Sequence, residues 1–266
     1  MIARTITRTT EEDSVDDHCG GGTGEFRAGD VLLLECPFTA TTVTKVGPHY
    51  LSVRWPWLVV DPAVDSIRWN GDFAIALPGS LDWGRLHYGC EPPVQELRAG
   101  DACRVGLAPT VVHVLRVDHF DPPLETGMLP RPACYVTLLA QGEAEQPEDE
   151  DQGFPIDPAG GEPLRLDLLL RPYAFLEPGD ELADRAGRAW RFDAAWEWHA
   201  FDGAEPGGDD GQPAWPLVLL TRGGAPVLPQ SEPAEAVARA TASGSHAEQL
   251  ARWTELTRVA PLRYPG

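Results

Sequence analysis

Residues 97–101 read Leu-Arg-Ala-Gly-Asp, and two other stretches repeat this pattern of a large apolar residue, two intervening residues and Gly-Asp. They are Phe-Arg-Ala-Gly-Asp at 26–30 and Leu-Glu-Pro-Gly-Asp at 176–180, so the three aspartates lie 71 and 79 residues apart. Gly tolerates a positive φ and an Asp side chain bonds to nearby backbone, which makes Gly-Asp typical of a tight turn. Each copy ends one apolar stretch and starts another. The pattern therefore predicts a small β unit that recurs along the chain.

Short runs of β-branched and aromatic residues surround these turns and are typical of antiparallel strands. Asn70-Gly71, which lies between apolar residues, predicts a hairpin turn. The flanks of the second and third turns also match: Leu86 and Leu166 precede them by about fifteen residues, which supports an internal repeat. The expected strands lie at 31–36, 39–46, 50–55 and 67–77 in the first unit, at 111–117 and 134–139 in the second, and at 164–168, 190–192, 196–198 and 215–220 in the third.

The sequence predicts a mostly β protein with two or three small antiparallel β-barrel or sandwich units and a short C-terminal helical segment. The Gly-Asp pattern and the apolar run after it resemble the first turn of SH3-like small barrels, at the level of the fold only, which implies no activity. The organisation that we expect is a disordered leader at 1–24, two β units in one domain at 25–141, an acidic linker at 142–162, a third β unit at 163–224 and a helical appendage at 225–266.

Two helices are expected near the C-terminal end of this sequence. Ser245-His246-Ala247-Glu248 has the form of a capping box, and Leu250, Trp253 and Leu256 follow it at nearly helical spacing. One face of this helix could dock on a β domain. A weaker helix is expected from Glu232 to about Ala242.

The charge balance of 21 basic and 41 acidic residues gives a formal net charge of -20. Such a field repels phosphate backbones and anionic lipid surfaces, so we expect neither nucleic acid nor a membrane as a partner. The five cysteines form no C-x-x-C pair, and the first 25 residues contain no apolar run of the kind found in signal peptides. Lys45 is the lone lysine among abundant Arg, Ala, Gly and Pro, a composition typical of GC-rich genomes. The expected location is the bacterial cytoplasm.

Nine tryptophans include two closely spaced pairs, Trp55/Trp57 and Trp196/Trp198. In an extended strand each pair would lie on one face and could form a platform for a sugar ring or a peptide proline. The alternative is that the indoles fill the interior of small barrels, whose limited cores need large side chains. These four residues are the candidate ligand-binding positions.

Catalytic and metal motifs are weak by comparison. His113, Asp118, His119 and Asp121 form one cluster of acid and base groups along the sequence, and Asp193, Glu197, His199 and Asp202 form another. His87, Cys90, Cys103 and His113 carry zinc-compatible atoms at a poor spacing, and each Gly-Asp turn has too few acids for a calcium loop. Nucleophile-elbow, phosphate-loop and dinucleotide motifs do not occur. We therefore assign no catalytic residue, no metal ligand and no cofactor.

These features favour a non-catalytic protein-interaction or assembly module whose partner is another protein, bound through the C-terminal helix. A homo-oligomer fits the same hypothesis. The alternatives are a small-ligand or glycan binder that uses the paired tryptophans and, less favoured, a hydrolase-type enzyme with a His/Asp site.

Overall fold

The computed structural model describes residues 26–64, 69–77, 86–146, 148–149, 151–203 and 211–259. The expected leader at 1–24 and the start of the expected strand at 67–77 lie outside these residues. The strands are β1 (Val31–Val46), β2 (Tyr50–Arg54), β3 (Val59–Val60), β4 (Asp72–Ala76), β5 (Gly89–Glu91), β6 (Ala102–His119), β7 (Met128–Leu129), β8 (Cys134–Ala140), β9 (Phe154–Ile156), β10 (Arg165–Leu170), β11 (Glu181–Ala183), β12 (Ala189–Ala194), β13 (Glu197–Ala200), β14 (Val218–Arg222) and β15 (Ala225–Pro226). The helices are the short 3-10 helix η1 (Val94–Glu96), α1 (Glu232–Ser243) and α2 (His246–Thr257).

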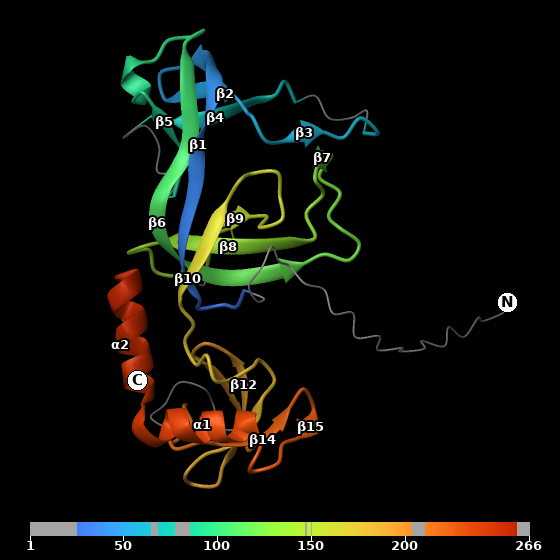
Figure 1. Ribbon diagram of the computed structural model, residues 1–266, viewed down its shortest axis with the longest axis vertical. Helices are drawn as coiled ribbons and strands as arrows, with labels where there is room; N and C mark the ends of the chain where they lie inside the picture. Colours follow the sequence, from blue (N-terminus) through green and yellow to red (C-terminus); the bar gives the residue numbers. More distant parts are fainter. Residues whose placement is uncertain are drawn as a thin grey trace, which may run out of the picture.

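Two curled antiparallel sheets account for most of the described chain, so the prediction of a mostly β fold with a C-terminal helical segment is confirmed. The larger sheet has the order β4-β2-β1-β6-β8-β9, with β10 also paired to β1 and β5 to β6. The smaller sheet has the order β13-β12-β11-β14-β15. Figure 1 shows the larger sheet above the smaller one, with α1 beneath and α2 standing beside both. Neither α-helix of the described chain is long and apolar enough to cross a membrane.

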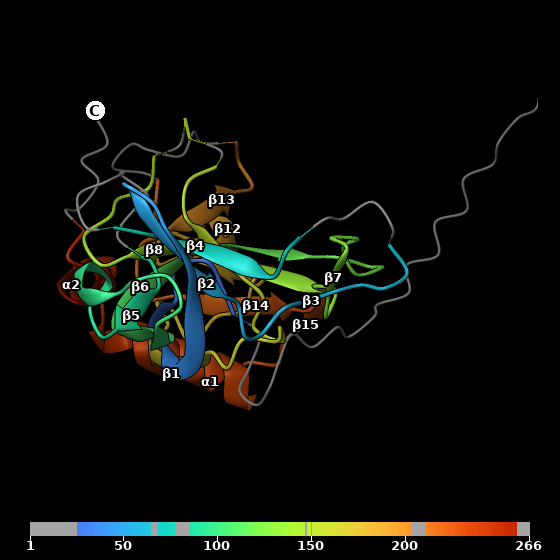
Figure 2. The same ribbon diagram turned by 90° about the horizontal axis from the view of Figure 1, so that it is seen from above.

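The long strands β1 and β6 connect the two halves of the larger sheet. They pair along most of their length and bend at register shifts near Cys36. The close approach of the strands requires glycine at Gly106, because a Cβ there would lie 2.6 Å from the Cys36 carbonyl oxygen. Viewed from above, β3 and β7 form a small separate ladder at one side (Figure 2). One continuous core fills the sheet, with Leu32, Leu51 and Val105 fully buried.

The strands of the first two predicted units share this one sheet, since β1 and β6 begin after the first and second Gly-Asp turns. The segment expected to be an acidic linker contains β9, which pairs with β8. The first strand expected in the third unit is β10, and it pairs with β1. It pairs there because Leu166 and Leu170 add apolar surface to the larger sheet, in register with Leu34 and Val31.

The smaller sheet surrounds a core rich in aromatic residues. Tyr173 is fully buried at its centre, and the rings of Phe192 and Trp198 pack around it. α1 covers this core and contributes the buried side chain of Val237. The Glu232–Ala242 prediction thus matches α1 closely. The capping prediction for α2 also holds at Ser245, whose hydroxyl accepts a hydrogen bond from the backbone N–H of Glu248.

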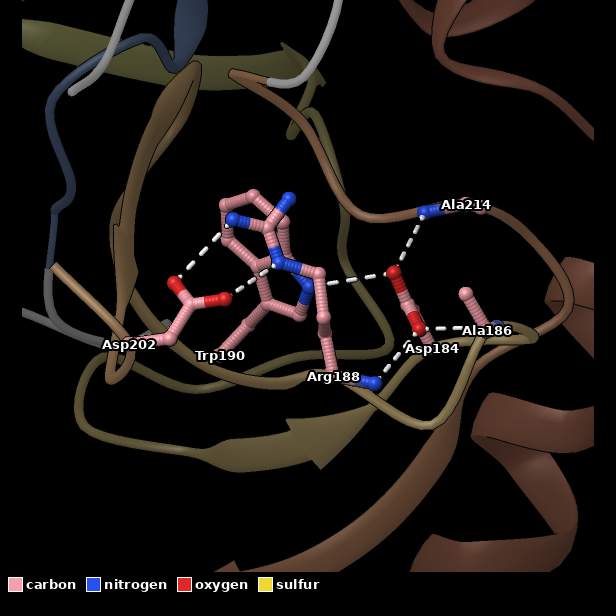
Figure 3. Close-up of polar contacts among 6 residues, drawn as sticks. All are labelled: Asp184, Ala186, Arg188, Trp190, Asp202 and Ala214. Atoms are coloured by element: carbon pink, nitrogen blue, oxygen red, sulfur yellow. Dashed lines mark hydrogen bonds and ion pairs between the residues drawn. The ribbon is translucent and has the colours of Figure 1, made fainter. Parts of the chain in front are cut away.

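Asp184 connects three segments of the smaller sheet (Figure 3). Its carboxylate accepts hydrogen bonds from the backbone N–H groups of Ala186, Arg188 and Ala214 and from the indole N–H of Trp190. Burial alone would raise the pKa of Asp184, but these four donors outweigh it and lower the pKa. The network holds the strand connection at 184–188 and fixes the N–H edge of the Trp190 indole.

The three Gly-Asp turns have the same local geometry. Gly29, Gly100 and Gly179 have φ values of 87°, 93° and 85°. In each turn the Asp carboxylate accepts a hydrogen bond from the backbone N–H three residues earlier, at Arg27, Arg98 and Glu177. Each turn also forms a two-bond bridge with a neighbouring strand residue, namely Val114, Val43 and Phe192. The aspartate in each turn therefore stabilises the turn by bonding to its backbone, as expected from a turn-forming residue.

Candidate functional site: a pocket between the two sheets

The first Gly-Asp turn is where the two sheets meet. A Cβ on Gly29 would lie 2.5 Å from the Cβ of Ala195, at the tip of the β12–β13 hairpin. Asp30 is fully buried and receives two hydrogen bonds from the Arg171 guanidinium, at 2.6 and 2.8 Å. Arg27 donates a hydrogen bond to the Leu176 carbonyl oxygen. These contacts join the first Gly-Asp turn to the hairpin tip and to residues 171–176, which connect the larger sheet to the smaller one.

α2 closes the same junction from one side. Its Trp253 indole N–H donates a 3.0 Å hydrogen bond to the Gly29 carbonyl oxygen, and its Thr257 carbonyl oxygen accepts from the Gly142 N–H. At its other end, His246 bonds to the hydroxyl of Tyr173 in the smaller core. The apolar face that the sequence analysis expected to dock on a β domain therefore packs on both sheets of its own chain.

A pocket of about 220 Å³ lies in this junction, and we call it the junction pocket. The Gly29 turn, β6, the β12–β13 hairpin and α2 all contribute to its walls. The residues that shape its chemistry are His113, Glu145, Trp196, Glu197, Gln212 and Trp253.

His113 is a buried polar residue in the wall of the junction pocket. It lies on β6 and is only 4% exposed. Burial lowers the pKa of its imidazole to about 4, so the ring is neutral at physiological pH. Its Nδ1 atom has no hydrogen-bond partner among the described residues. Buried polar atoms are nearly always satisfied, so an orphan in a pocket wall marks a place where a ligand group could bond.

The two indoles of the junction pocket come from different elements. Trp196 lies at the tip of the β12–β13 hairpin with φ of 72°, a region that a bulky side chain rarely adopts. Its ring lies between two others: Tyr173 of the smaller core, 5.2 Å away between centroids, and Trp253 of α2, 6.2 Å away at 71°. The His113 ring lies 5.1 Å from the Trp253 ring. An unfavourable backbone conformation that places an aromatic ring in a pocket is a recognised mark of a functional position.

Trp198, the other member of this sequence pair, is 6% exposed and belongs to the core of the smaller sheet. Its ring packs on Tyr173 and Phe192. Because Trp196 is in the turn and Trp198 is in β13, the two indoles do not form a platform on one strand face.

The first pair lies in the larger sheet, away from the junction. Trp55 is 4% exposed, and the half-buried Trp57 ring meets it edge-on with centroids 4.7 Å apart. Tyr88 packs on both. A groove of about 330 Å³ lies next to this cluster and is lined by Phe73, Tyr88, Tyr135, Phe154, Asp157 and Glu162.

We call this second hollow the Tyr88 groove. The Tyr88 hydroxyl donates a hydrogen bond to the Glu162 carboxylate. Burial, followed by the nearby charge of Asp157, raises the pKa of Glu162 above its usual range, against the effect of its hydrogen bonds. The Glu162 carboxylate is thus already hydrogen-bonded within the chain. In the junction pocket, by contrast, His113 Nδ1 has no partner among the described residues.

Neither His/Asp cluster of the sequence is assembled as a whole, although one hollow contains members of both. His113 lines the junction pocket, whereas His119 lines a separate hollow of about 410 Å³ on the other side of the Gly29 turn, with Asp193 and Glu197. His199 is exposed and its ring contacts Phe201. Asp202 pairs with Arg188, and Asp118 pairs with Arg116. His113 and His119 are close in sequence but have different surroundings, because they lie at different points along the long strand β6.

Cys90 and Cys103, from the zinc-compatible set, lie together on the paired strands β5 and β6. Burial, then the neighbouring Cys103, raises the pKa of Cys90 to about 12, so it stays a thiol. His113 is ten residues further along β6. Among the described residues no group of three or more His, Cys, Asp or Glu side chains is arranged to hold a metal ion.

Trp253, Glu145 and Gln212 are pocket residues that the sequence does not mark as candidates. Trp253 was visible only as part of a helical apolar stripe, and nothing local in the sequence indicates that this stripe faces Trp196. Comparison of the chain with protein-family models, with curated proteins and with solved structures finds no match. Evidence on function therefore comes from the geometry of the chain itself.

Proposed function

We propose that this protein binds a small molecule in the junction pocket, between its two β-sheets and α2. The observation that carries the proposal is the His113 ring, which is buried in the pocket wall with its Nδ1 atom unpartnered. A ligand that bonds to this atom would remove the cost of an unsatisfied buried group. Trp196 supports the proposal, because its unfavourable backbone conformation places an indole in the same pocket.

The direct test is a thermal-shift screen of the purified protein against small metabolites of four kinds: ammonium compounds, sugars, nucleosides and carboxylic acids. Binding to the folded state raises its stability, by about 2.7 kcal/mol at a concentration one hundred times Kd. Hits should be lost in Trp196→Gly and kept in Trp57→Gly, which removes an indole outside the junction. A screen without hits, or hits that persist equally in both variants, would overturn the proposal.

A second function, protein interaction, rests on a different observation. Val218 and Leu220 alternate with buried Leu219 on β14 and are 56% and 40% exposed, so they form an apolar outer face on the smaller sheet. Exposed apolar surface of this kind is typical of protein–protein contacts. We propose that a second copy of this chain covers this face in the bacterial cytoplasm, the compartment that the cysteine usage of the sequence favours.

Sedimentation velocity over a wide concentration range tests this second function. The protein should self-associate, and the double substitution Val218→Glu with Leu220→Glu should give a monomer. A matched change of charge on α1, Ala236→Glu with Ala240→Glu, should leave association intact. A wild-type protein that stays monomeric at all concentrations would exclude self-association through this face.

A further inference from the structure

The rim of the junction pocket carries two carboxylates, Glu145 and Glu197. Both side chains are exposed, and Glu197 lies at the start of β13, directly after Trp196. Burial, followed by the charges of Asp193 and Glu145, raises the pKa of Glu197. Both carboxylates line the same pocket, so a charged group inside the pocket would interact with both.

The charge of the rim carboxylates is not balanced within the described chain. Asp193 is paired with Arg191, but neither Glu145 nor Glu197 forms an ion pair with a described basic side chain. The described residues that line the junction pocket include no Lys or Arg. Two adjacent carboxylates repel each other, so a cation bound between them would be stabilised by both.

The walls of the junction pocket suit a cation that also carries apolar groups. The Trp196 and Trp253 rings meet at 71°, so they present surfaces in two directions. An ammonium group over the face of an indole is attracted by the electron-rich ring. The third ring, His113, is uncharged at neutral pH and does not repel the cation. Its Nδ1 atom can bond to a hydroxyl or N–H group of the same ligand.

Other ligand classes fit these groups less well. An anion would face Glu145 and Glu197 without a compensating basic group in the described lining. A metal ion would need three or more suitable ligands, and the described residues offer no such group. A neutral apolar molecule would fill the aromatic walls but would leave the rim carboxylates unpaired.

We propose that the junction pocket binds a small organic cation, with its ammonium group between Glu145, Glu197 and the two indoles and its polar tail at His113. This inference rests on the proposed small-molecule function and names the chemical class of the ligand. Glu145 and Glu197 are then specificity-determining residues, and Trp196 and Trp253 supply the contact surface.

Isothermal titration calorimetry with matched probes tests this inference. Choline and butylammonium are compared with their neutral counterparts, 3,3-dimethyl-1-butanol and 1-butanol. We expect at least one cation to bind at least tenfold more tightly than its neutral counterpart, a difference of about 1.4 kcal/mol. Equal binding of cation and neutral counterpart would overturn the cation inference and leave the small-molecule function standing. Failure of both cations to bind would also overturn the inference, and the metabolite screen then decides the fate of the wider proposal.

The rim is tested by the double substitution Glu145→Gln with Glu197→Gln. It should weaken the binding of the cation at least fivefold and leave the neutral counterpart unchanged. The control is Glu96→Gln with Glu235→Gln, which makes the same change in net charge on η1 and α1, away from the pocket. Equal weakening by the two double variants would assign the effect to the overall field of the protein and contradict a role for the rim.

Discussion

The two tryptophan pairs have the same spacing in the sequence but different surroundings in the fold. In both pairs one indole belongs to a core, Trp55 in the larger sheet and Trp198 in the smaller. The other member differs. Trp57 packs edge-on against its own partner, whereas Trp196 adopts a φ of 72° and faces Trp253 from a distant part of the chain. The spacing of two residues thus marks aromatic strand ends, and the backbone at the member outside the core decides whether its indole completes a core or lines a pocket.

The largest expected effect concerns the core member of each tryptophan pair. Trp55→Ala and Trp198→Ala should each lower the free energy of unfolding by about 3–5 kcal/mol, because each removes a buried aromatic side chain and leaves a cavity. Urea denaturation measures both. A loss below about 1 kcal/mol in either variant would show that its indole is not part of a packed core.

His113 makes the stability of the junction pocket depend on pH. Its folded-state pKa of about 4 is below the unfolded value of about 6.5, so the unfolded chain binds the proton first. The stability contributed by the neutral ring is present above pH 6.5 and is lost as the pH falls towards 4, by up to about 3 kcal/mol.

The measurement compares the wild-type protein with His113→Gln, whose side chain does not titrate. Urea denaturation between pH 7 and 4 should show a steeper loss of stability in the wild type. Parallel curves would mean that His113 is protonated without cost and is not buried as described.

Gly29 and Gly100 offer a test of the junction itself, since their turns have the same geometry and different neighbours. Ala at either position strains a positive φ, which costs about 1–2 kcal/mol. Only Gly29→Ala adds a clash, with the Ala195 Cβ, whereas a Cβ on Gly100 meets no atom within 4 Å. Thermal unfolding should therefore show a larger loss for Gly29→Ala, by about 1–2 kcal/mol. Equal losses would indicate that the sheets do not meet at this turn.

The smallest expected change is at Trp196. Trp196→Gly loses half-buried packing against Tyr173 and Trp253 but relieves an unfavourable φ, a gain of about 1–3 kcal/mol. The net change in the free energy of unfolding should lie within about 1 kcal/mol, while Trp57→Gly, with no positive φ to relieve, should be clearly destabilised. The same urea titration on both variants decides this. A loss at Trp196→Gly as large as at Trp57→Gly would show that Trp196 is a core residue.

The sequence predicts local features of this fold well and its long-range arrangement poorly. Gly-Asp turns, β-branched runs and the Ser245 cap depend on neighbouring residues, and the structure has turns, strands and a helix at those places. The pairing of β10 with β1 and the docking of α2 depend on contacts across more than one hundred residues. No local pattern encodes such contacts.

The candidate site shows the same division. Trp196 was identified as a candidate because aromatic pairs are visible in the sequence, and His113 because imidazoles are. Their convergence with Trp253 depends on a positive φ at an aromatic residue and on the path of α2, and neither can be read from composition or periodicity.

The central claim is that the junction pocket, and not the Trp55 cluster, binds a small organic cation. Titration of the tighter-binding of the two cations, choline or butylammonium, into protein with ¹⁵N-labelled tryptophan tests it most directly, because each of the nine indole N–H groups gives its own NMR signal, assigned with single Trp→Phe variants. The account predicts that the signals of Trp196 and Trp253 shift with a common saturation curve while those of Trp55 and Trp57 stay in place. Shifts at Trp55 and Trp57 instead, or no shift at any indole, would contradict it.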